Sequence, residues 1–159
     1  MAIVAIIIAS IGFWWFSHDK SPKQSDCQVV AEMLDYASSQ TQTIGSFDMS
    51  TVGDNPKPYL DSLDQLVKRE SEYTDKISDS SIKEKAQKLA DSYRETTEFQ
   101  KWSIDNPDHP TQEEILSGKP TREFQERAEK SQELSQRQEQ RLKDLQGSCP
   151  GTSTPPSTL

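Results

Sequence analysis

The chain has 159 residues and a formal net charge of -8, and 31% of its residues are apolar. Fourteen of the apolar residues lie in the first sixteen positions, so the other 143 residues are only about a quarter apolar, well below the ~45–50% of typical globular domains. This balance excludes a large enzyme core and a parallel-sheet fold, and the negative charge argues against nucleic-acid binding.

Residues 1–16 form an uncharged apolar run, MAIVAIIIASIGFWWF, that ends in three aromatic side chains. As a helix the run would span about 24 Å, slightly less than a hydrocarbon core of ~30 Å. Trp14, Trp15 and Phe16 stand where an interfacial aromatic belt would lie. We expect an uncleaved membrane anchor. A cleaved signal peptide and a buried helix fit less well, because no basic residue precedes the run and the rest of the chain is too polar to bury it.

Two features disagree about the side of the membrane on which the rest of the chain lies. Lys20 and Lys23 follow the apolar run while only the terminal amine precedes it, which favours a cytoplasmic body. Two cysteines and a Ser/Thr/Pro-rich tail are commoner outside the cytoplasm. We expect a single-pass protein of the cell membrane with an extracytoplasmic body.

A polar linker over residues 17–26 is followed by the first predicted helix of the body. From Cys27 onward apolar residues recur at spacings of three, four and seven, and Gly45 is expected to end the helix. Ser25 or Asp26 can cap its first turn. The apolar stripe comprises Val29, Val30, Met33, Leu34, Ala37 and Ile44.

Two further helices are predicted before residue 105. Residues 46–57 contain a glycine and an Asn-Pro pair and are predicted to be a loop, after which Pro58 fits the first turn of a helix. A turn is expected at residues 79–81, where an Asp or Ser can cap the next helix. The two apolar stripes comprise Leu60, Leu63, Leu66, Val67, Tyr73 and Ile77, and then Ile82, Ala86, Leu89, Tyr93 and Phe99 or Trp102.

A long connection over residues 105–120, with one helical turn over 111–116, leads to a fourth predicted helix, Arg122 to Gln146. This last segment has no Gly or Pro, and its acid-first pairs four residues apart each add about 0.2–0.5 kcal/mol. The pairs are Glu123–Arg127, Glu126–Lys130, Glu133–Arg137 and Glu139–Lys143. Its thin apolar stripe comprises Phe124, Ala128, Leu134, Leu142 and Leu145. Residues 147–159 are predicted to be a disordered tail.

We therefore predict an all-α fold, in which an N-terminal transmembrane helix is followed by an up-down bundle of three to four helices over residues 27–146. In a four-helix bundle of this kind Cys27 and Cys149 fall at the same pole, so a disulfide between them is geometrically reasonable. Two free thiols or intermolecular pairing are the alternatives. A metal or redox pair is disfavoured because no third ligand accompanies the cysteines.

No residue pattern points to catalysis, a metal site or a cofactor. Neither histidine belongs to a Glu-x-x-His pair, and phosphate-loop, HExxH and GxSxG motifs are absent from the sequence. An acidic cluster in the long connection lacks the alternation and glycine of a calcium loop, and we interpret it as solvated. It comprises Asp105, Asp108, His109, Glu113 and Glu114. The chain is predicted not to be an enzyme.

Five aromatic residues have two interpretations, as core or as ligand contacts: Tyr59, Tyr73, Tyr93, Phe99 and Trp102. They fall on the faces assigned to the core, so core packing is predicted, and any that is exposed becomes an interface anchor. The polar face of Arg122 to Gln146 is either a solvated cover or a surface on which a partner protein docks.

The opening stretch Asp26-Cys27-Gln28-Val29-Val30, the short anchor, the acidic helical body, the second cysteine and the Pro/Thr tail resemble small membrane-anchored or exported proteins of actinobacteria, of the mycobacterial type. The resemblance implies a location in the cell envelope and glycosylation of the tail. The tail positions are Thr152, Ser153, Thr154, Ser157 and Thr158. The resemblance implies no activity.

Together these features predict a membrane-anchored, extracytoplasmic helical interaction or scaffold protein of the cell envelope. Residues 1–16 would contact the lipid bilayer and the helices would contact a protein partner. Two alternatives are a cytoplasm-facing coiled-coil subunit of a membrane complex and a bundle that binds a lipid or a small apolar ligand.

Overall fold

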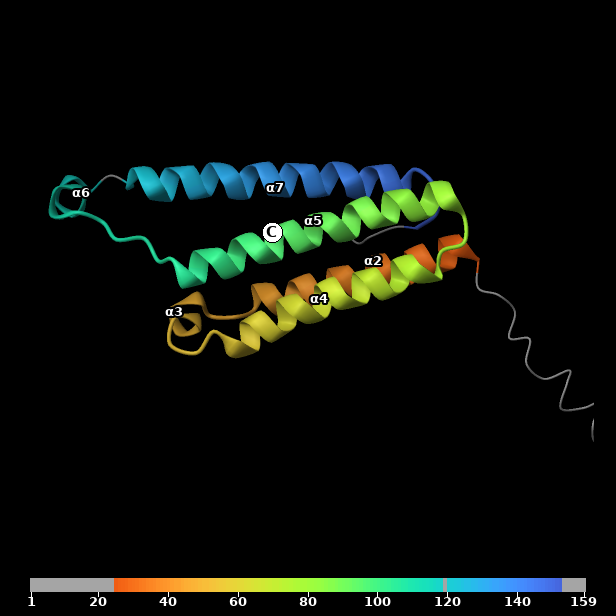
Figure 1. The fold of residues 1–159 in the computed structure, drawn as a ribbon, viewed down its shortest axis with the longest axis horizontal. Helices are drawn as coiled ribbons and strands as arrows, with labels where there is room; N and C mark the ends of the chain where they lie inside the picture. Colours follow the sequence, from red (N-terminus) through yellow and green to blue (C-terminus); the bar gives the residue numbers. More distant parts are fainter. Residues whose placement is uncertain (1–24, 119, 153–159) are drawn as a thin grey trace, which may run out of the picture.

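The computed structural model describes residues 25–118 and 120–152, and all its regular structure over these ranges is helical (Figure 1). The four long helices are α2 (Asp26–Gly45), α4 (Lys57–Lys76), α5 (Ser80–Asp105) and α7 (Arg122–Gln146), and the two short ones are α3 (Met49–Val52) and α6 (Gln112–Ser117). The predicted all-α bundle of about four helices is confirmed.

The predicted anchor over residues 1–16, with its aromatic end at Trp14, Trp15 and Phe16, lies outside the described residues. Among the residues that are described, no helix combines the length and the apolar character needed to cross a bilayer. Membrane attachment therefore stays a prediction from sequence.

Side chains at the helix starts explain why the helix boundaries could be predicted. Ser25 and Gln28 form a capping box at the start of α2, and the Asp79 carboxylate accepts two backbone N–H bonds at the start of α5. The prediction of a loop throughout residues 46–57 is wrong. Asp48 caps the four-residue helix α3, and Val52 of α3 is buried.

The long helices pack in chain order, α2 on α4, α4 on α5 and α5 on α7. The first and last helices, α2 and α7, do not pack along their length in the same way. Figure 1 shows that α5 and α7 lie close together at one end of the molecule and diverge toward the other, where α3 and α6 lie. We call the first end, with Cys27 and Cys149, the disulfide pole, and the second the apolar pole.

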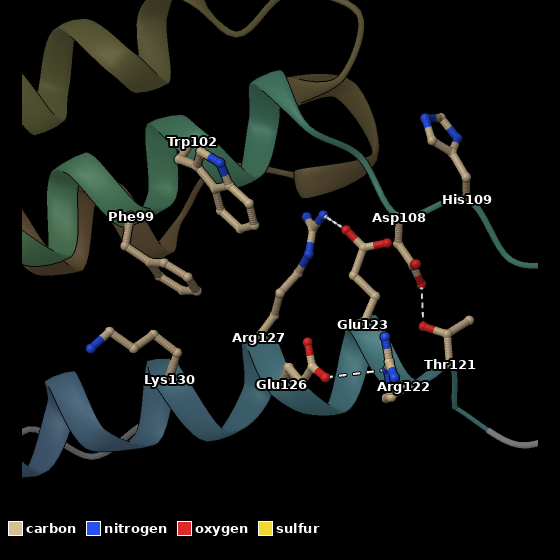
Figure 2. A pocket seen from close by; sticks show the side chains of 10 residues that line it. All are labelled: Phe99, Trp102, Asp108, His109, Thr121, Arg122, Glu123, Glu126, Arg127 and Lys130. Carbon is tan, nitrogen blue, oxygen red and sulfur yellow. Dashed lines mark hydrogen bonds and ion pairs between the residues drawn. The ribbon is translucent and has the colours of Figure 1, made fainter.

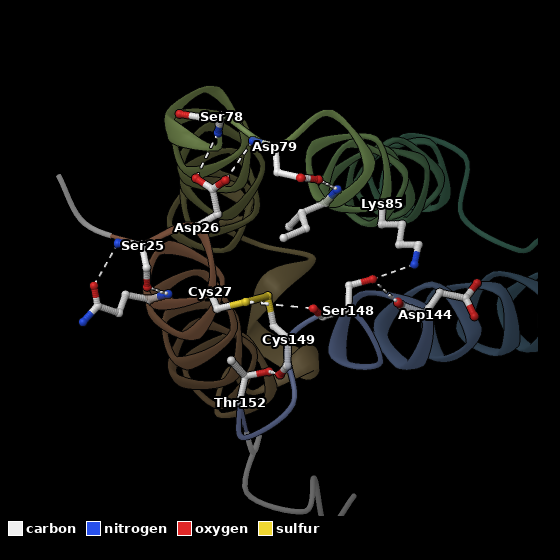
Figure 3. Close-up of a disulfide and its surroundings, with 12 residues drawn as sticks. Ser25, Asp26, Cys27, Ser78, Asp79, Lys85, Asp144, Ser148, Cys149 and Thr152 are labelled. Atoms are coloured by element: carbon white, nitrogen blue, oxygen red, sulfur yellow. Dashed lines mark hydrogen bonds between the residues drawn. A yellow bond between two sulfur atoms is a disulfide. The ribbon is translucent and has the colours of Figure 1, made fainter.

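The predicted disulfide is present between Cys27 and Cys149, whose Cα atoms are 5.3 Å apart (Figure 3). It ties the first turn of α2 to the residues just after α7. Cys149 and Leu145 of α7 are fully buried and belong to the main apolar core. That core is built chiefly from α2, α4 and α5, and a smaller cluster around Val52, Tyr59 and Leu63 closes the other end. The bond therefore holds the end of α7 in a core that the other helices make.

A buried glutamate interrupts the apolar stripe of α4. The inward positions of this helix, together with its C-cap residue Ile77, follow alternating spacings of four and three: Tyr59, Leu63, Leu66, Glu70, Tyr73 and Ile77. Glu70 is fully buried, and neither of its carboxyl oxygens has a hydrogen-bond partner among the described residues. Burial raises the pKa of Glu70 to about 8.

Polar groups of two other long helices lie close enough to Glu70 to be affected by its charge. Its negative charge contributes to the raised pKa values of Tyr36 on α2 and Tyr93 on α5, for which burial is the larger cause. Gln138 of α7 is hydrogen-bonded to Tyr93. A titratable group thus lies inside the bundle, close to side chains of α2 and α5, and Tyr93 connects it indirectly to α7.

Replacing Cys27 by serine should lower the free energy of unfolding, because the unfolded chain is no longer constrained by a bond between residues 122 positions apart. The loss should reach at most about 5 kcal/mol. Thermal unfolding followed by circular dichroism measures it, with Cys149→Ser and the reduced wild-type chain as matched comparisons. All three should melt at similarly lowered temperatures. An oxidised wild-type chain that melts with them would contradict the prediction.

Stability should fall as the pH rises, because Glu70 binds its proton more tightly in the folded chain (pKa about 8) than in the unfolded one, at its ordinary 4.5. The loss of stability begins as the pH rises above the unfolded-state pKa of 4.5, and it is complete above the folded-state pKa of about 8. Glu70→Gln should match the wild type at about pH 5 and exceed it by a few kcal/mol at about pH 9. Glu129→Gln, at an exposed position of α7, is the control. Denaturant unfolding across this range tests the prediction, and equal pH dependence in wild type and Glu70→Gln would refute it.

Candidate functional site

The large apolar side chains that are exposed among the described residues all come from the apolar pole. They are Met49 (59% exposed), Trp102 (46%), Ile115 (64%), Leu116 (79%) and Phe124 (55%). They are contributed by α3, the end of α5, α6 and the start of α7. In a chain with so few apolar residues, this gathering of exposed ones at one end marks a candidate interaction surface.

A groove of about 660 Å³ lies at the same pole, between the last turns of α5 and the first turns of α7. Figure 2 shows Phe99 and Trp102 on its α5 side, Arg127 and Lys130 on its α7 side, and His109 in the connection beyond α5. The groove opens because the two helices diverge here, as Figure 1 shows.

Trp102 lies between an aromatic ring and a cation. The rings of Phe99 and Trp102 are stacked, with centroids 6.0 Å apart and planes inclined by 22°. On its other side the guanidinium of Arg127 lies 4.7 Å from the Trp102 ring centroid. Arg127 also donates to the carbonyl oxygen of Ser103 at 3.4 Å and pairs with Glu123. These contacts hold Trp102 in place although nearly half of its surface is exposed.

Thr121 fixes the start of α7 at the edge of the groove. Its hydroxyl accepts the backbone N–H of Phe124 at 2.9 Å, as a helix cap, and donates to the carboxylate of Asp108 at 2.7 Å. Asp108 belongs to the connection that follows α5. One buried threonine therefore joins that connection to α7, whose first turn carries the exposed Phe124.

The bases of the groove are matched by acids on α7. Arg122 pairs with Glu126 at 3.3 Å, and Lys130 pairs with Glu133 at 3.0 Å. The predicted Glu126–Lys130 pair is therefore wrong, because both side chains have other partners. The other three predicted pairs of α7 are present: Glu123–Arg127, Glu133–Arg137 and Glu139–Lys143. Over residues 105–130 seven acidic residues face four basic ones, so this pole is acidic.

The acidic cluster predicted in the connection includes Asp108, whose carboxylate is bonded to Thr121. Within residues 25–118 and 120–152, no three or more side chains of the metal-ligating types gather closely enough to hold an ion. The arrangement at this pole is suited to contact with another molecule, through aromatic rings, an ordered arginine and a charged rim.

The prediction that the aromatic set is core holds for Tyr59 and Tyr93, which are buried, and partly for Tyr73 and Phe99. It is wrong for Trp102, as is the assignment of Phe124 to the buried stripe of α7. Both lie where α5 and α7 diverge, so no helix covers them. Ile115 and Leu116 were not identified as candidates from sequence, although an apolar pair between prolines and acidic residues is a signal of exposure.

Comparisons of the chain with protein-family models, with curated proteins and with solved structures find no match. The functional interpretation therefore depends on the chemistry and the geometry of the residues themselves. At the apolar pole, both point to a candidate surface for a protein partner.

Replacing Arg127 by alanine should expose Trp102 to solvent, because the guanidinium that covers one side of the ring is removed. Acrylamide quenching of fluorescence measures this in a Trp14→Phe/Trp15→Phe background, where Trp102 is the remaining tryptophan. The cation–π contact and hydrogen bond should also account for about 1 kcal/mol of stability.

Arg94→Ala is the matched control for this experiment. Arg94 is an arginine of α5 that pairs with Asp91 of the same helix at 2.8 Å. Quenching should rise in the Arg127 variant and stay unchanged in the Arg94 variant. The same quenching in both would show that Arg127 does not cover the ring.

Proposed function

We propose that the protein is a non-catalytic interaction module of the cell envelope that binds a protein partner through its apolar pole. The single observation that carries this proposal is the location of the exposed Trp102, Ile115, Leu116 and Phe124 at one end of the molecule. Tryptophan and arginine are the residue types that contribute most at protein interfaces, and the groove holds both, in contact with each other.

The chemistry of the pole favours a protein segment with a large apolar side chain flanked by basic residues. The apolar side chain would enter the groove beside Trp102 and Phe99. The basic residues would meet the excess of acidic side chains over residues 105–130. The same acidity disfavours an anionic bilayer as the occupant of this pole, because like charges repel at such a surface.

The remaining part of the proposal is attachment to the membrane by residues 1–16, with the body outside the cytoplasm. Two observations support it. The apolar run precedes a body whose first described helix, α2, begins at the disulfide pole, at the opposite end from α3 and α6 (Figure 1). Stable disulfides such as Cys27–Cys149 are typical of oxidising compartments. The partner surface would then point away from the membrane.

One observation favours a second candidate function, the binding of a small molecule. The groove volume of about 660 Å³ lies within the range of ~300–1,000 Å³ that is usual for ligand sites. Its charged lining, with Arg122, Glu123, Glu126 and Lys130, is unlike the mainly apolar walls of sites for lipids. We therefore place this function second.

A photo-crosslinking residue at Leu116 or Phe124 should link the full chain to one partner protein in cells that naturally make it, whereas the same residue at Gln132, exposed on the middle of α7, should not. The identified partner is then purified and its affinity measured by calorimetry. Trp102→Ala should weaken binding by about tenfold or more, because it removes the anchor of the surface.

Gln132→Ala is the matched control and should bind as the wild type does. Crosslinking that is equal at Gln132 and at Leu116, or an affinity that is unchanged by Trp102→Ala, would overturn the proposed surface. Loss of folding is excluded as a cause by comparing the melting curves of the two variants.

A further inference from the structure

A second groove, at the disulfide pole, gathers basic side chains in an otherwise acidic protein. It measures about 380 Å³ and lies between the first turns of α5 and the last turns of α7. Lys85, Lys88, Arg141 and Lys143 line it, against one acidic residue, Asp144. Four cations and one carboxylate give this lining a formal charge of +3, whereas the whole chain carries -8.

Two of the four cations are held in place by the fold. Arg141 donates to the carbonyl oxygen of Lys88 at 2.8 Å and lies 3.7 Å from a carboxyl oxygen of Glu95. Lys85 donates to the hydroxyl of Ser148 at 2.5 Å, and Figure 3 shows this contact beside the disulfide. The groove therefore has a fixed basic floor that bridges α5 and α7.

The other two cations stand at the rim and have only exposed partners. Lys88 pairs with Glu84 at 2.7 Å, and Lys143 pairs with Glu139 at 2.6 Å, each one turn away on its own helix. In all four of these side chains more than half of the surface is exposed. Exposed pairs of this kind contribute little in water, so a phosphate can replace either glutamate.

The location of the groove indicates where a phosphate that binds these cations would come from. Ser148, which binds Lys85, precedes Cys149, and the disulfide joins Cys149 to Cys27, two residues after Ser25. The chain that precedes Ser25 has eight polar-linker residues, 17–24, after the apolar run of residues 1–16. Eight residues reach at most about 28 Å. If residues 1–16 are inserted in a bilayer, the disulfide pole is therefore held near the lipid headgroups.

We propose that this groove binds the phosphate of anionic lipid headgroups and so orients the bundle with its disulfide pole against the membrane. The inference rests on the proposed membrane attachment through residues 1–16. Because the protein as a whole is acidic, an anionic bilayer repels it, and a local basic groove is what can hold one pole to the surface. The apolar pole is then directed away from the membrane.

The test is an amine-acetylation footprint of the full chain on lipid vesicles. Vesicles of phosphatidylcholine alone are compared with vesicles that also contain phosphatidylglycerol, and a third sample has phosphatidylcholine vesicles with inorganic phosphate. Flotation reports whether the chain is attached. Acetylation at Lys85, Lys88 and Lys143 should slow by about threefold or more on the anionic vesicles only, and high salt should reverse this.

A charge-reversed pair tests the groove itself. In Lys88→Glu/Lys143→Glu the protection of Lys85 on anionic vesicles should be lost. In Lys57→Glu/Lys68→Glu it should persist, since these lysines are on α4, are even more exposed than Lys88 and Lys143, and each likewise pairs with an acid one turn away. Protection that survives the first double variant would overturn the assignment to this groove.

Three other outcomes overturn the inference in distinguishable ways. A chain that floats with both kinds of vesicle and is acetylated equally on them is attached, but its groove does not bind lipid headgroups. Protection by inorganic phosphate as strong as that by anionic vesicles shows a site for free phosphate instead. A chain that floats with neither kind refutes membrane attachment, and the inference falls with it.

Discussion

The disulfide between Cys27 and Cys149 is the constraint on which the rest of the structure depends. Outside its first sixteen residues the chain is poor in apolar side chains, and α2 and α7 do not pack along their length, so packing alone does little to join the first helix to the last. The covalent bond joins these two helices at one pole and keeps Leu145 in the common core. At that pole the four helices are held together without extensive packing between the first and the last.

The absence of a matching constraint at the other pole explains the candidate site. There α7 is attached to the connection after α5 through Thr121 and Asp108, and to α5 itself through Arg127 over Trp102. Polar and cation–π contacts of this kind tolerate separation of the helices better than an apolar seam does. The helices diverge, the groove opens, and Trp102 and Phe124 are left exposed. The exposed surface that we propose as the binding site is thus a consequence of where the bundle is closed and where it is not.

The scarcity of apolar residues is also visible inside the bundle, where Glu70 occupies a core position. It occupies an inward position between Leu66 and Tyr73, where an apolar residue would give higher stability. Its charge acts on Tyr36 of α2 and Tyr93 of α5, so its protonation is linked to the packing of these two helices against α4. Ionisation of this carboxyl group therefore lowers the stability of the folded bundle.

Much of the fold could be predicted from the sequence, because helix caps and periodic apolar positions are local signals. The bounds of α7 follow from Thr121 and Gly147, and the disulfide follows from the positions of two cysteines in an up-down bundle. The stripe of α4 was predicted without position 70, and that gap was the only sign of Glu70. The exposure of Trp102 could not be predicted, since its spacing from Phe99 is the same whether or not a helix covers it. It depends on the divergence of α5 and α7, which is a property of the whole bundle.

The two poles give the molecule a direction, from a covalently closed end toward the end that we propose contacts a partner. That account requires the Cys27–Cys149 bond to exist in the cell, on the outer side of the membrane. Labelling intact cells with a membrane-impermeant thiol reagent, before and after mild reduction, tests this most directly, with both cysteines read by mass spectrometry. The account predicts labelling of Cys27 and Cys149 only after reduction. Labelling that requires cell lysis and needs no reductant would place free thiols in the cytoplasm and contradict it.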